Sequence, residues 1–388
     1  MKILIAPDSF KESLSAKAVA AALERGLRRA LPGIAVIKVP MADGGEGTVE
    51  AVLAARRGRW VRRRVTGPLG EPVEARFGLF GAGDTAIIEV AAASGLPLVP
   101  PRRRNPLATT SFGTGELMRH ALALGARRLI VGLGGSATND GGAGMAQALG
   151  FVFRDRRGRV IERPLTGGTL GAVAAVERQA VALSGIDIEG ACDVRNPLIG
   201  PKGASVVFGP QKGATPAMVE TLDRNLAHFG RLLETVSGRK LLRLSGGGAA
   251  GGMGAGLVAL AGARLRPGAE LVMELVALRK RMKDVDLVIT GEGNIDCQTA
   301  FGKAPAGVAG LARTLGIPVV AVGGGLADDA DRLFGRGVAA LESAVVRPQS
   351  LDDALINSNN YLISAGERIA RWLILASSLK SRTEPIDL

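Results

Sequence analysis

Residues 3–10 read ILIAPDSF, and this stretch indicates the class of fold. An unbroken apolar run is typical of a strand buried on both faces, and the acidic and hydroxyl residues after it are typical of a loop. Residues 16–30 then place apolar side chains at helical spacing, with Ser15 as the expected N-cap. Ser9 with Glu12 is a competing capping box. The segment therefore predicts a strand, a loop and a helix.

The same pattern recurs at both ends of the chain. Residues 35–40, AVIKVP, lead into the loop ADGGEGT at 42–48 and a second helix. Three more buried strands are predicted near the C-terminus, at residues 286–293 (DLVITGEG), 318–325 (PVVAVGGG) and 338–346 (VAALESAVV). Strands that alternate with helices form parallel sheets. We expect the two N-terminal and three C-terminal strands to share one parallel sheet.

The middle of the chain has a different pattern. Residues 61–80 and 85–91 alternate like antiparallel strands separated by Gly/Pro turns. An apolar strand at 128–136 runs into a glycine-rich turn and a helix, and residues 204–210, ASVVFGP, also read as a strand. This region is expected to form a second α/β domain.

A chain of 388 residues exceeds the size at which one hydrophobic core stops growing, so two domains are expected. We predict a discontinuous first domain, residues 1–63 and 284–388, and an inserted second domain, residues 64–283.

Charge and composition narrow the functional class. The net charge is +13, but the basic residues are scattered in clusters such as 62–64 and 102–104 without aromatic residues between them, which argues against a nucleic-acid partner. No apolar run reaches the roughly 18–20 residues that cross a membrane, and no signal peptide is recognisable, so we expect a cytoplasmic protein. Cys192 and Cys297 lie far apart, which supports neither a disulfide nor a zinc site.

Glycine makes up 55 residues and clusters where the apolar strands end. In open α/β sheets, ligands bind outside the carboxyl ends of the strands, where loops expose backbone N–H groups. The candidate loops are residues 6–15, 42–48, 132–144, 245–256 and 290–303.

Neither of two common nucleotide-binding motifs is well matched by the sequence. The chain has no GxxxxGK[ST] P-loop. A GxGxxG pattern occurs at Gly246, Gly248 and Gly251, but the preceding LLRL is a poor buried strand. A flexible loop or a loop that contacts phosphate is favoured there, and an NAD-dependent hydroxy-acid dehydrogenase is the alternative function.

The segment 132–145, GLGGSATNDGGAGM, carries a more specific signal. Its glycines let the backbone approach an anion closely, and its hydroxyls can donate hydrogen bonds. Asp140 would either hold magnesium or cap the following helix, and both alternatives stay open. The candidate phosphate-binding residues here are Gly134, Gly135, Ser136, Thr138 and Asp140.

Acidic and basic residues occupy the other loops. Phosphoryl transfer needs carboxylates to place Mg²⁺, cations to offset charge and often a carboxylate base, although each acid could equally cap a turn. The candidates are Asp8, Lys11, Asp43, Glu46, Glu292 and Asp296 in the parallel domain and Asp193 in the insertion.

Seven blocks of these loops, in order along nearly the whole chain, resemble the type I glycerate kinase family. The blocks are IAPDSFKESLSA, PMADGGEGT, ATTSFGTGEL, GLGGSATNDGGAGM, ACDVRNPLIGPKGA with FGPQKGA, GGGAAGGMGAGL, and TGEGNIDCQTAFGKAPAGVA. One departure is Asn294, which stands where the family's TGEGxID block usually has arginine.

The resemblance implies an enzyme that uses ATP and Mg²⁺ to phosphorylate D-glycerate, giving 2-phosphoglycerate, with 3-phosphoglycerate the less favoured product. It also implies a flavodoxin-like domain, a second domain likened to a restriction-endonuclease fold, and an active site in the cleft between them. A homodimer is an open alternative to a monomer.

The roles of residues follow from the resemblance as hypotheses. Lys11 and Lys303 would offset phosphate or carboxylate charge, and Asp193 and Asp296 would bind metal or act as the base. The residues expected to bind substrate or phosphate are Asp8, Ser9, Asp43, Gly44, Gly45, Glu46, Thr114, Arg195 and Glu292, together with the 134–142 loop.

Overall fold

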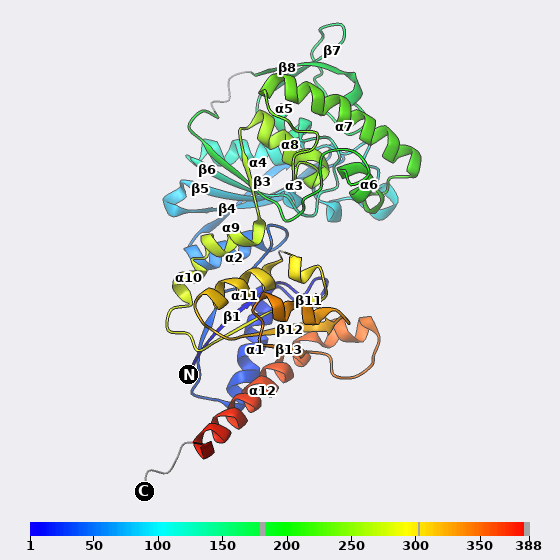
Figure 1. The fold of residues 1–388 in the computed structure, drawn as a ribbon. Helices are drawn as coiled ribbons and strands as arrows, with labels where there is room; N and C mark the ends of the chain where they lie inside the picture. Colours follow the sequence, from blue (N-terminus) through cyan, green and yellow to red (C-terminus); the bar gives the residue numbers. More distant parts are fainter. Residues whose placement is uncertain (179–182, 302, 384–388) are drawn as a thin grey trace. The chain divides into compact units, whose positions relative to one another are not determined.

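The computed structural model describes residues 1–178, 183–301 and 303–383. These residues pack as two compact units (Figure 1). The first unit comprises Met1–Asp43 and Val272–Leu388, and the second comprises Gly44–Leu271. The predicted boundaries stood after residues 63 and 283. Residues 44–63 were predicted for the first domain but lie in the second unit. They include part of strand β3 (Arg59–Thr66), which pairs along its whole length with β4 (Pro72–Phe80) of that unit.

The first unit is built on a five-stranded parallel sheet, as expected. The strands are β1 (Lys2–Pro7), β2 (Ala35–Lys38), β11 (Leu287–Ile295), β12 (Val319–Leu326) and β13 (Ala340–Ser343). Their order is β13-β12-β11-β1-β2, which is the flavodoxin-like order. The strand order reverses between β1 and β11. In open sheets of this kind the ligand crevice lies at that reversal, at the carboxyl ends of the strands.

Helices of the first unit bury the apolar strand residues. Ile3 and Ile5 of β1 share a core cluster with Leu23 of α1 (Ala16–Ala30) and Ile369 of α12 (Leu351–Thr383). The remaining helices are α9 (Gly268–Leu275, which spans the boundary between the units), α10 (Leu278–Arg281) and α11 (Ala304–Thr314).

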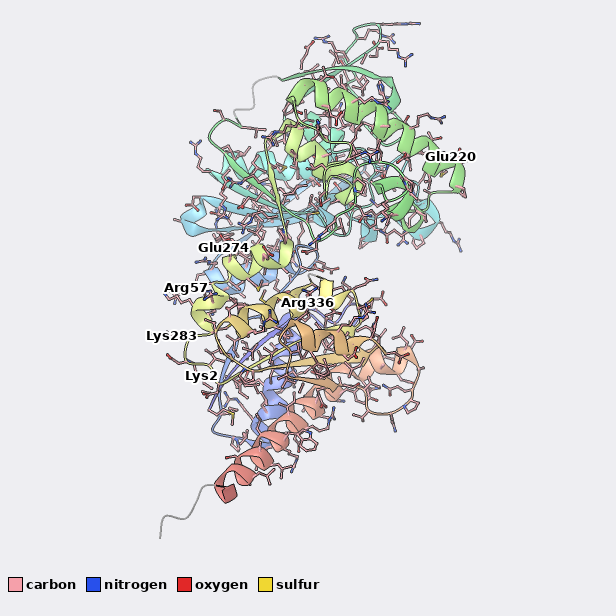
Figure 2. The ribbon with its side chains drawn as sticks, viewed as in Figure 1. Lys2, Arg57, Glu220, Glu274, Lys283 and Arg336 are labelled. Atoms are coloured by element: carbon pink, nitrogen blue, oxygen red, sulfur yellow. The ribbon has the colours of Figure 1, made fainter. Side chains whose placement is uncertain are left out.

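The start of α1 lies where the sequence predicted it. Its N-cap is Ser15, whose Oγ accepts a hydrogen bond from the Ala18 N–H at 3.3 Å. At the amino ends of the central strands, the Lys2 ammonium donates to the Lys283 carbonyl at 3.4 Å (Figure 2). Segments that are distant in sequence are therefore joined in one unit.

Helices α1 and α12 run side by side (Figure 1). They approach through glycine: a Cβ placed on Gly26 would lie 2.0 Å from the Ile363 carbonyl oxygen, and one on Gly366 would lie 2.4 Å from the Leu23 carbonyl oxygen. Both distances are far below van der Waals contact, so these positions exclude any side chain.

The contact between α1 and α12 gives a stability prediction. Gly26→Ala should lower the free energy of unfolding by about 1–3 kcal/mol through overpacking, although alanine is the better helix former. Gly310→Ala is the matched control, because nothing lies within 4 Å of a Cβ at this helical glycine. It should raise stability by about 0.5–1 kcal/mol. Urea unfolding would measure both, and equal effects would contradict the close packing.

The second unit contains a mixed six-stranded sheet in the order β10-β9-β6-β5-β4-β3. Strands β3, β4 and β5 are antiparallel as predicted, and β5, β6, β9 and β10 are parallel. A separate pair, β7 with β8, is antiparallel. The bounds not yet given are β5 Thr85–Glu89, β6 Arg128–Gly132, β7 Phe151–Asp155, β8 Val173–Arg178, β9 Asp187–Ala191 and β10 Arg264–Arg266.

The helices of this unit include the long amphipathic α7, whose N-cap is Thr215. Their bounds are α2 Thr48–Arg56, α3 Ala91–Ser94, α4 Phe112–Ala123, α5 Ala143–Ala148, α6 Ala204–Phe208, α7 Pro216–Ser237 and α8 Ala249–Leu260. Over both units, short 3₁₀ helices span Gly81–Gly83, Leu96–Leu98, Pro101–Arg103, Leu170–Ala172, Pro210–Lys212, Thr299–Phe301 and Ala330–Arg336.

One strand prediction was wrong. Residues 204–210 form helix α6 and the start of a 3₁₀ helix instead of a strand. A short apolar run does not distinguish the two structures by itself. Here the helix buries Ala204 and Ser205 while Val206 and Val207 stay exposed, so tertiary packing outweighs the strand preference of the two valines.

Within the described residues, no helix combines the length and the apolar character needed to span a membrane.

Candidate functional site

In the first unit, predicted site residues meet where the strand order reverses. Asp8 directly follows β1, and its backbone N–H donates to the Gly291 carbonyl of β11 at 2.8 Å. The Ser9 N–H in turn donates to Asp8 Oδ1 at 2.6 Å. The pairing of β1 with β11 therefore places the loop that holds Asp8 and Ser9 beside the end of β11.

Asp8 has an unusual electrostatic environment. Its side chain is buried, and burial is the main reason why its pKa rises to about 7. The charges of Asp43 and Glu292 raise the pKa further, whereas the Ser9 N–H and Lys11 oppose the shift. Three acids of the predicted site are thus close enough to influence one another, and a bound cation would relieve their repulsion.

A second network joins β11 to the start of α11. Thr299 Oγ1 donates to Glu292 Oε1 at 2.5 Å, and Lys303 Nζ donates to Glu292 Oε2 at 3.2 Å. The Thr299 N–H donates to Asp296 Oδ1 at 3.1 Å. Burial acts to raise the pKa of Asp296, but the Thr299 N–H and the charge of Lys303 outweigh it, so the pKa is lowered. Asp296 is therefore an ionised carboxylate beside a lysine.

Glu292, Asp296 and Lys303 border a cavity of about 710 Å³ that lies within the first unit. Its wall includes Lys11, which is exposed, and Asn294, which lies opposite Gly325 on β12. Other predicted residues on the wall are Ser9, Glu292, Asp296 and Lys303.

In the second unit, glycines bring two predicted loops together. A Cβ on Gly132 would lie 2.4 Å from the Gly44 carbonyl oxygen, and one on Gly134 would lie 2.7 Å from Gly45 Cα. The loop 44–48 therefore packs directly on the 132–142 loop at the carboxyl end of β6. Gly135 and Glu46 are exposed in these loops.

The Asp140 carboxylate accepts hydrogen bonds from groups inside the second unit. It is fully buried and accepts from the Ser111 N–H at 2.8 Å, the Ser111 hydroxyl at 2.7 Å and the Gly142 N–H at 3.1 Å. Burial raises the pKa of Asp140, and these hydrogen bonds oppose the rise. Asp140 also accepts from the Gly144 N–H in the first turn of α5 at 3.3 Å, which fits the alternative in which it caps that helix; a role with magnesium stays a prediction.

Three other predicted residues lie in different surroundings. Thr114 is fully buried with its Oγ1 2.8 Å from Ser94 Oγ, so it offers no surface to a ligand in this conformation. Asp193 follows β9, and its Oδ1 accepts from the N–H groups of Gly268 at 2.9 Å and Ala269 at 3.4 Å. Asp193 thus caps the amino end of α9, and Arg195 beside it is exposed.

The Gly246 loop is explained by packing. The preceding residues 241–244 form no strand, and a Cβ on Gly251 would lie 1.9 Å from the Thr138 carbonyl oxygen. A Cβ on Gly248 would lie 2.3 Å from the Pro197 carbonyl oxygen. The loop therefore lacks the strand that a dinucleotide-binding turn needs, and its glycines seat α8 against neighbouring loops.

Lys212 is a residue that the sequence reasoning missed. Its side chain is 3% exposed, and Nζ donates to Ser136 Oγ at 3.0 Å and to the Thr138 carbonyl at 2.6 Å. Burial lowers the pKa of Lys212 to about 7, although the charge of Asp140 acts to raise it. The available signal was the lysine between glycines in the block FGPQKGA. Lys212 thus anchors the turn that the sequence assigned to phosphate.

No three His, Cys, Asp or Glu side chains among the described residues are arranged to hold a metal ion by themselves. Magnesium usually keeps several waters and binds through one or two carboxylates together with substrate phosphates. The acids around Asp8 and the ionised Asp296 fit that mode of binding.

Comparison with known proteins identifies the chain. The model of the glycerate kinase family matches residues 3–374. A protein of Bacillus subtilis named glycerate kinase is 49% identical over 381 residues, 98% of this chain and 99% of that protein. A glycerate 2-kinase of Escherichia coli is 47% identical over 382 residues, 97% of this chain and 98% of that protein.

A solved structure agrees with these matches. It is described as a putative glycerate kinase 2 of Salmonella typhimurium, and it superposes with a TM-score of 0.86 at 49% identity, covering 97% of this chain and 99% of that one. The α/β fold, the acids and lysines at the strand ends and these relatives define the chain as an enzyme of the kinase class. It belongs to the glycerate kinase family.

The buried lysine gives a pH prediction. The pKa of Lys212 is lower in the folded protein than its ordinary value of 10.5, so the unfolded chain binds more protons between about pH 7 and pH 10. Stability linked to Lys212 is therefore present at high pH and is lost as the pH falls toward 7.

Lys212→Met removes this titration. As the pH rises from 7 to 9, the wild type should gain unfolding free energy relative to the variant, by up to about 1.4 kcal/mol per pH unit. Urea unfolding at several pH values would measure it, with Lys240→Met at an exposed position as the control. A difference that does not change with pH would contradict the lowered pKa of the buried Lys212.

Proposed function

We propose that this enzyme transfers the γ-phosphoryl group of ATP to the 2-hydroxyl of D-glycerate, giving 2-phosphoglycerate and ADP. The observation that carries the proposal is the 47% identity, over nearly all of both chains, with the glycerate 2-kinase of Escherichia coli. A cytoplasmic location, a homodimer and an active site between the two units stay predictions from the sequence.

The transfer needs a base, cations and a cradle for phosphate. A carboxylate takes the proton of the glycerate hydroxyl while the hydroxyl oxygen forms a bond to the γ-phosphorus. The bond between the γ-phosphorus and the ADP oxygen breaks at the same time. Asp296 supports this role because it is ionised and lies at the carboxyl end of β11. Asp193 is the second candidate, and Lys11 and Lys303 would offset the phosphate charge.

Magnesium would neutralise the phosphate oxygens when bound. Asp193 and Asp296 are the ligands expected from the sequence, and the acids around Asp8 are an addition from the structure. Repulsion from Asp43 and Glu292 contributes to the raised pKa of Asp8, and a divalent cation beside these acids would lower it again.

A direct experiment tests the reaction. The protein is incubated with ATP, Mg²⁺ and D-glycerate, and ³¹P and ¹³C NMR identify the phosphorylated carbon. We expect ADP and 2-phosphoglycerate in equal amounts. Formation of 3-phosphoglycerate would correct the position of transfer, and absence of both products would refute the proposed activity.

Two substitutions test the carboxylates. Asp296→Asn and Asp193→Asn should each lower kcat by about 10²–10⁴-fold, because a missing base or metal ligand acts on the transfer step. Circular dichroism checks that the fold is intact, which matters for Asp193 because it caps α9.

The matched controls are Asp331→Asn in the first unit and Glu220→Gln in the second (Figure 2), both at exposed positions. They should leave kcat unchanged. Near-normal turnover in both aspartate variants would remove them from the mechanism.

A further inference from the structure

The cavity of about 710 Å³ in the first unit is larger than glycerate requires. Cavities of about 300–1,000 Å³ hold ligands of drug size, and a three-carbon acid would leave most of this one empty. The loops after β1, β11 and β13 contribute to its wall, together with Gly324 and Gly325 of β12 and the first turns of α12. Its volume fits a nucleoside.

The wall is divided by chemistry. At the ends of β1 and β11 it carries Lys11, Asp296 and Lys303, which belong to the charged networks described above. The loop after β13 and helix α12 contribute an apolar part, which lies among polar residues such as Arg347, Ser350 and Ser358. Its members are Val345, Leu351, Ala354, Leu355 and Leu362. One part suits a planar apolar ring and the other suits phosphate groups.

Gln349 gives the apolar part a specific polar contact. Its Oε1 accepts a hydrogen bond from the Tyr361 hydroxyl at 2.6 Å. Its Nε2 is buried and has no hydrogen-bond partner among the described residues. A buried donor without an acceptor costs about 1–3 kcal/mol. An acceptor on a ligand, such as a ring nitrogen of a purine, would satisfy it.

We propose that this cavity binds the adenosine part of the nucleotide, with a purine ring nitrogen accepting from Gln349 Nε2 and the phosphates directed toward Lys11 and Lys303. The identity of the nucleotide rests on the proposed function, whereas the place where it binds rests on the cavity. Arg347, also on the wall, adds a positive charge near the nucleotide.

Filling the cavity tests the proposal. Ala354→Trp places a large side chain on the wall at the start of α12. The control is Ile356→Trp, because Ile356 lies two residues further on the same helix, is 79% exposed and is not part of the wall. Binding of a fluorescent ADP derivative without glycerate, and the KM values for ATP and glycerate, are measured for each.

We expect Ala354→Trp to weaken ADP binding and to raise the KM for ATP at least tenfold, with the KM for glycerate unchanged. Ile356→Trp should match the wild type. An unchanged KM for ATP in a folded Ala354→Trp protein would overturn the proposal. So would a rise in the KM for glycerate alone, because the cavity would then hold the acceptor.

Substitutions of Gln349 test the hydrogen bond and also serve if Ala354→Trp does not fold. Gln349→Glu keeps an acceptor for Tyr361 but replaces the free donor with a charged acceptor. Gln349→Leu removes the polar group altogether. Glutamate should weaken ADP binding more than leucine does, because its carboxylate and the purine ring nitrogen are both hydrogen-bond acceptors and repel each other. Equal ADP binding in the wild type and both variants would remove Gln349 from the site.

The two proposals fail separately. If the protein phosphorylates glycerate but Ala354→Trp binds ADP normally, the nucleotide lies elsewhere and the activity stands. If no phosphoglycerate forms but Ala354→Trp abolishes ADP binding, the cavity binds nucleotide and the proposed activity is wrong.

Discussion

The parallel pairing of β1 with β11 is the interaction on which the first unit depends. It joins Ile3 to Leu287 and continues in register to Pro7 and Gly291. The Asp8 N–H extends the ladder by one more hydrogen bond, and Thr290 Oγ1 donates to the Ala6 carbonyl at 2.8 Å. This pairing closes a loop of more than 280 residues, which contains the whole second unit. It also creates the reversal of strand order at which the charged loops meet.

In the second unit, several loops pack directly on one another at the carboxyl ends of the strands. Glycine allows it, because each contact at Gly132, Gly134 and Gly251 would bring a side chain into a neighbouring backbone. Such close packing buries polar groups, and an unpaired buried polar group is costly. Asp140 and Lys212 provide hydrogen-bond partners for several of these groups, including the Ser111 hydroxyl, the Ser136 hydroxyl and the Thr138 carbonyl.

The two units bury charge with opposite consequences. Asp8 lies among other acids, and its pKa is raised because burial and like charges both disfavour the carboxylate. Lys212 has the Asp140 carboxylate near it, yet burial still lowers its pKa. The first arrangement attracts cations, and the second holds a turn in one conformation. Both belong to the loops at strand ends, where function is concentrated in α/β folds.

The sequence by itself determined the strands of the first sheet and their grouping. Runs such as ILIAP and VVAVG are apolar on both faces, and only a parallel sheet covered by helices buries both faces. It also determined the cap at Ser15 and the loops that hold the candidate site, because glycine and acidic residues mark the ends of those strands. Tertiary structure alone decided the helix at Ala204–Phe208, the burial of Thr114 and Asp140, and the position of Lys212. These features depend on which distant segments pack against a residue, and local pattern carries no information about such contacts.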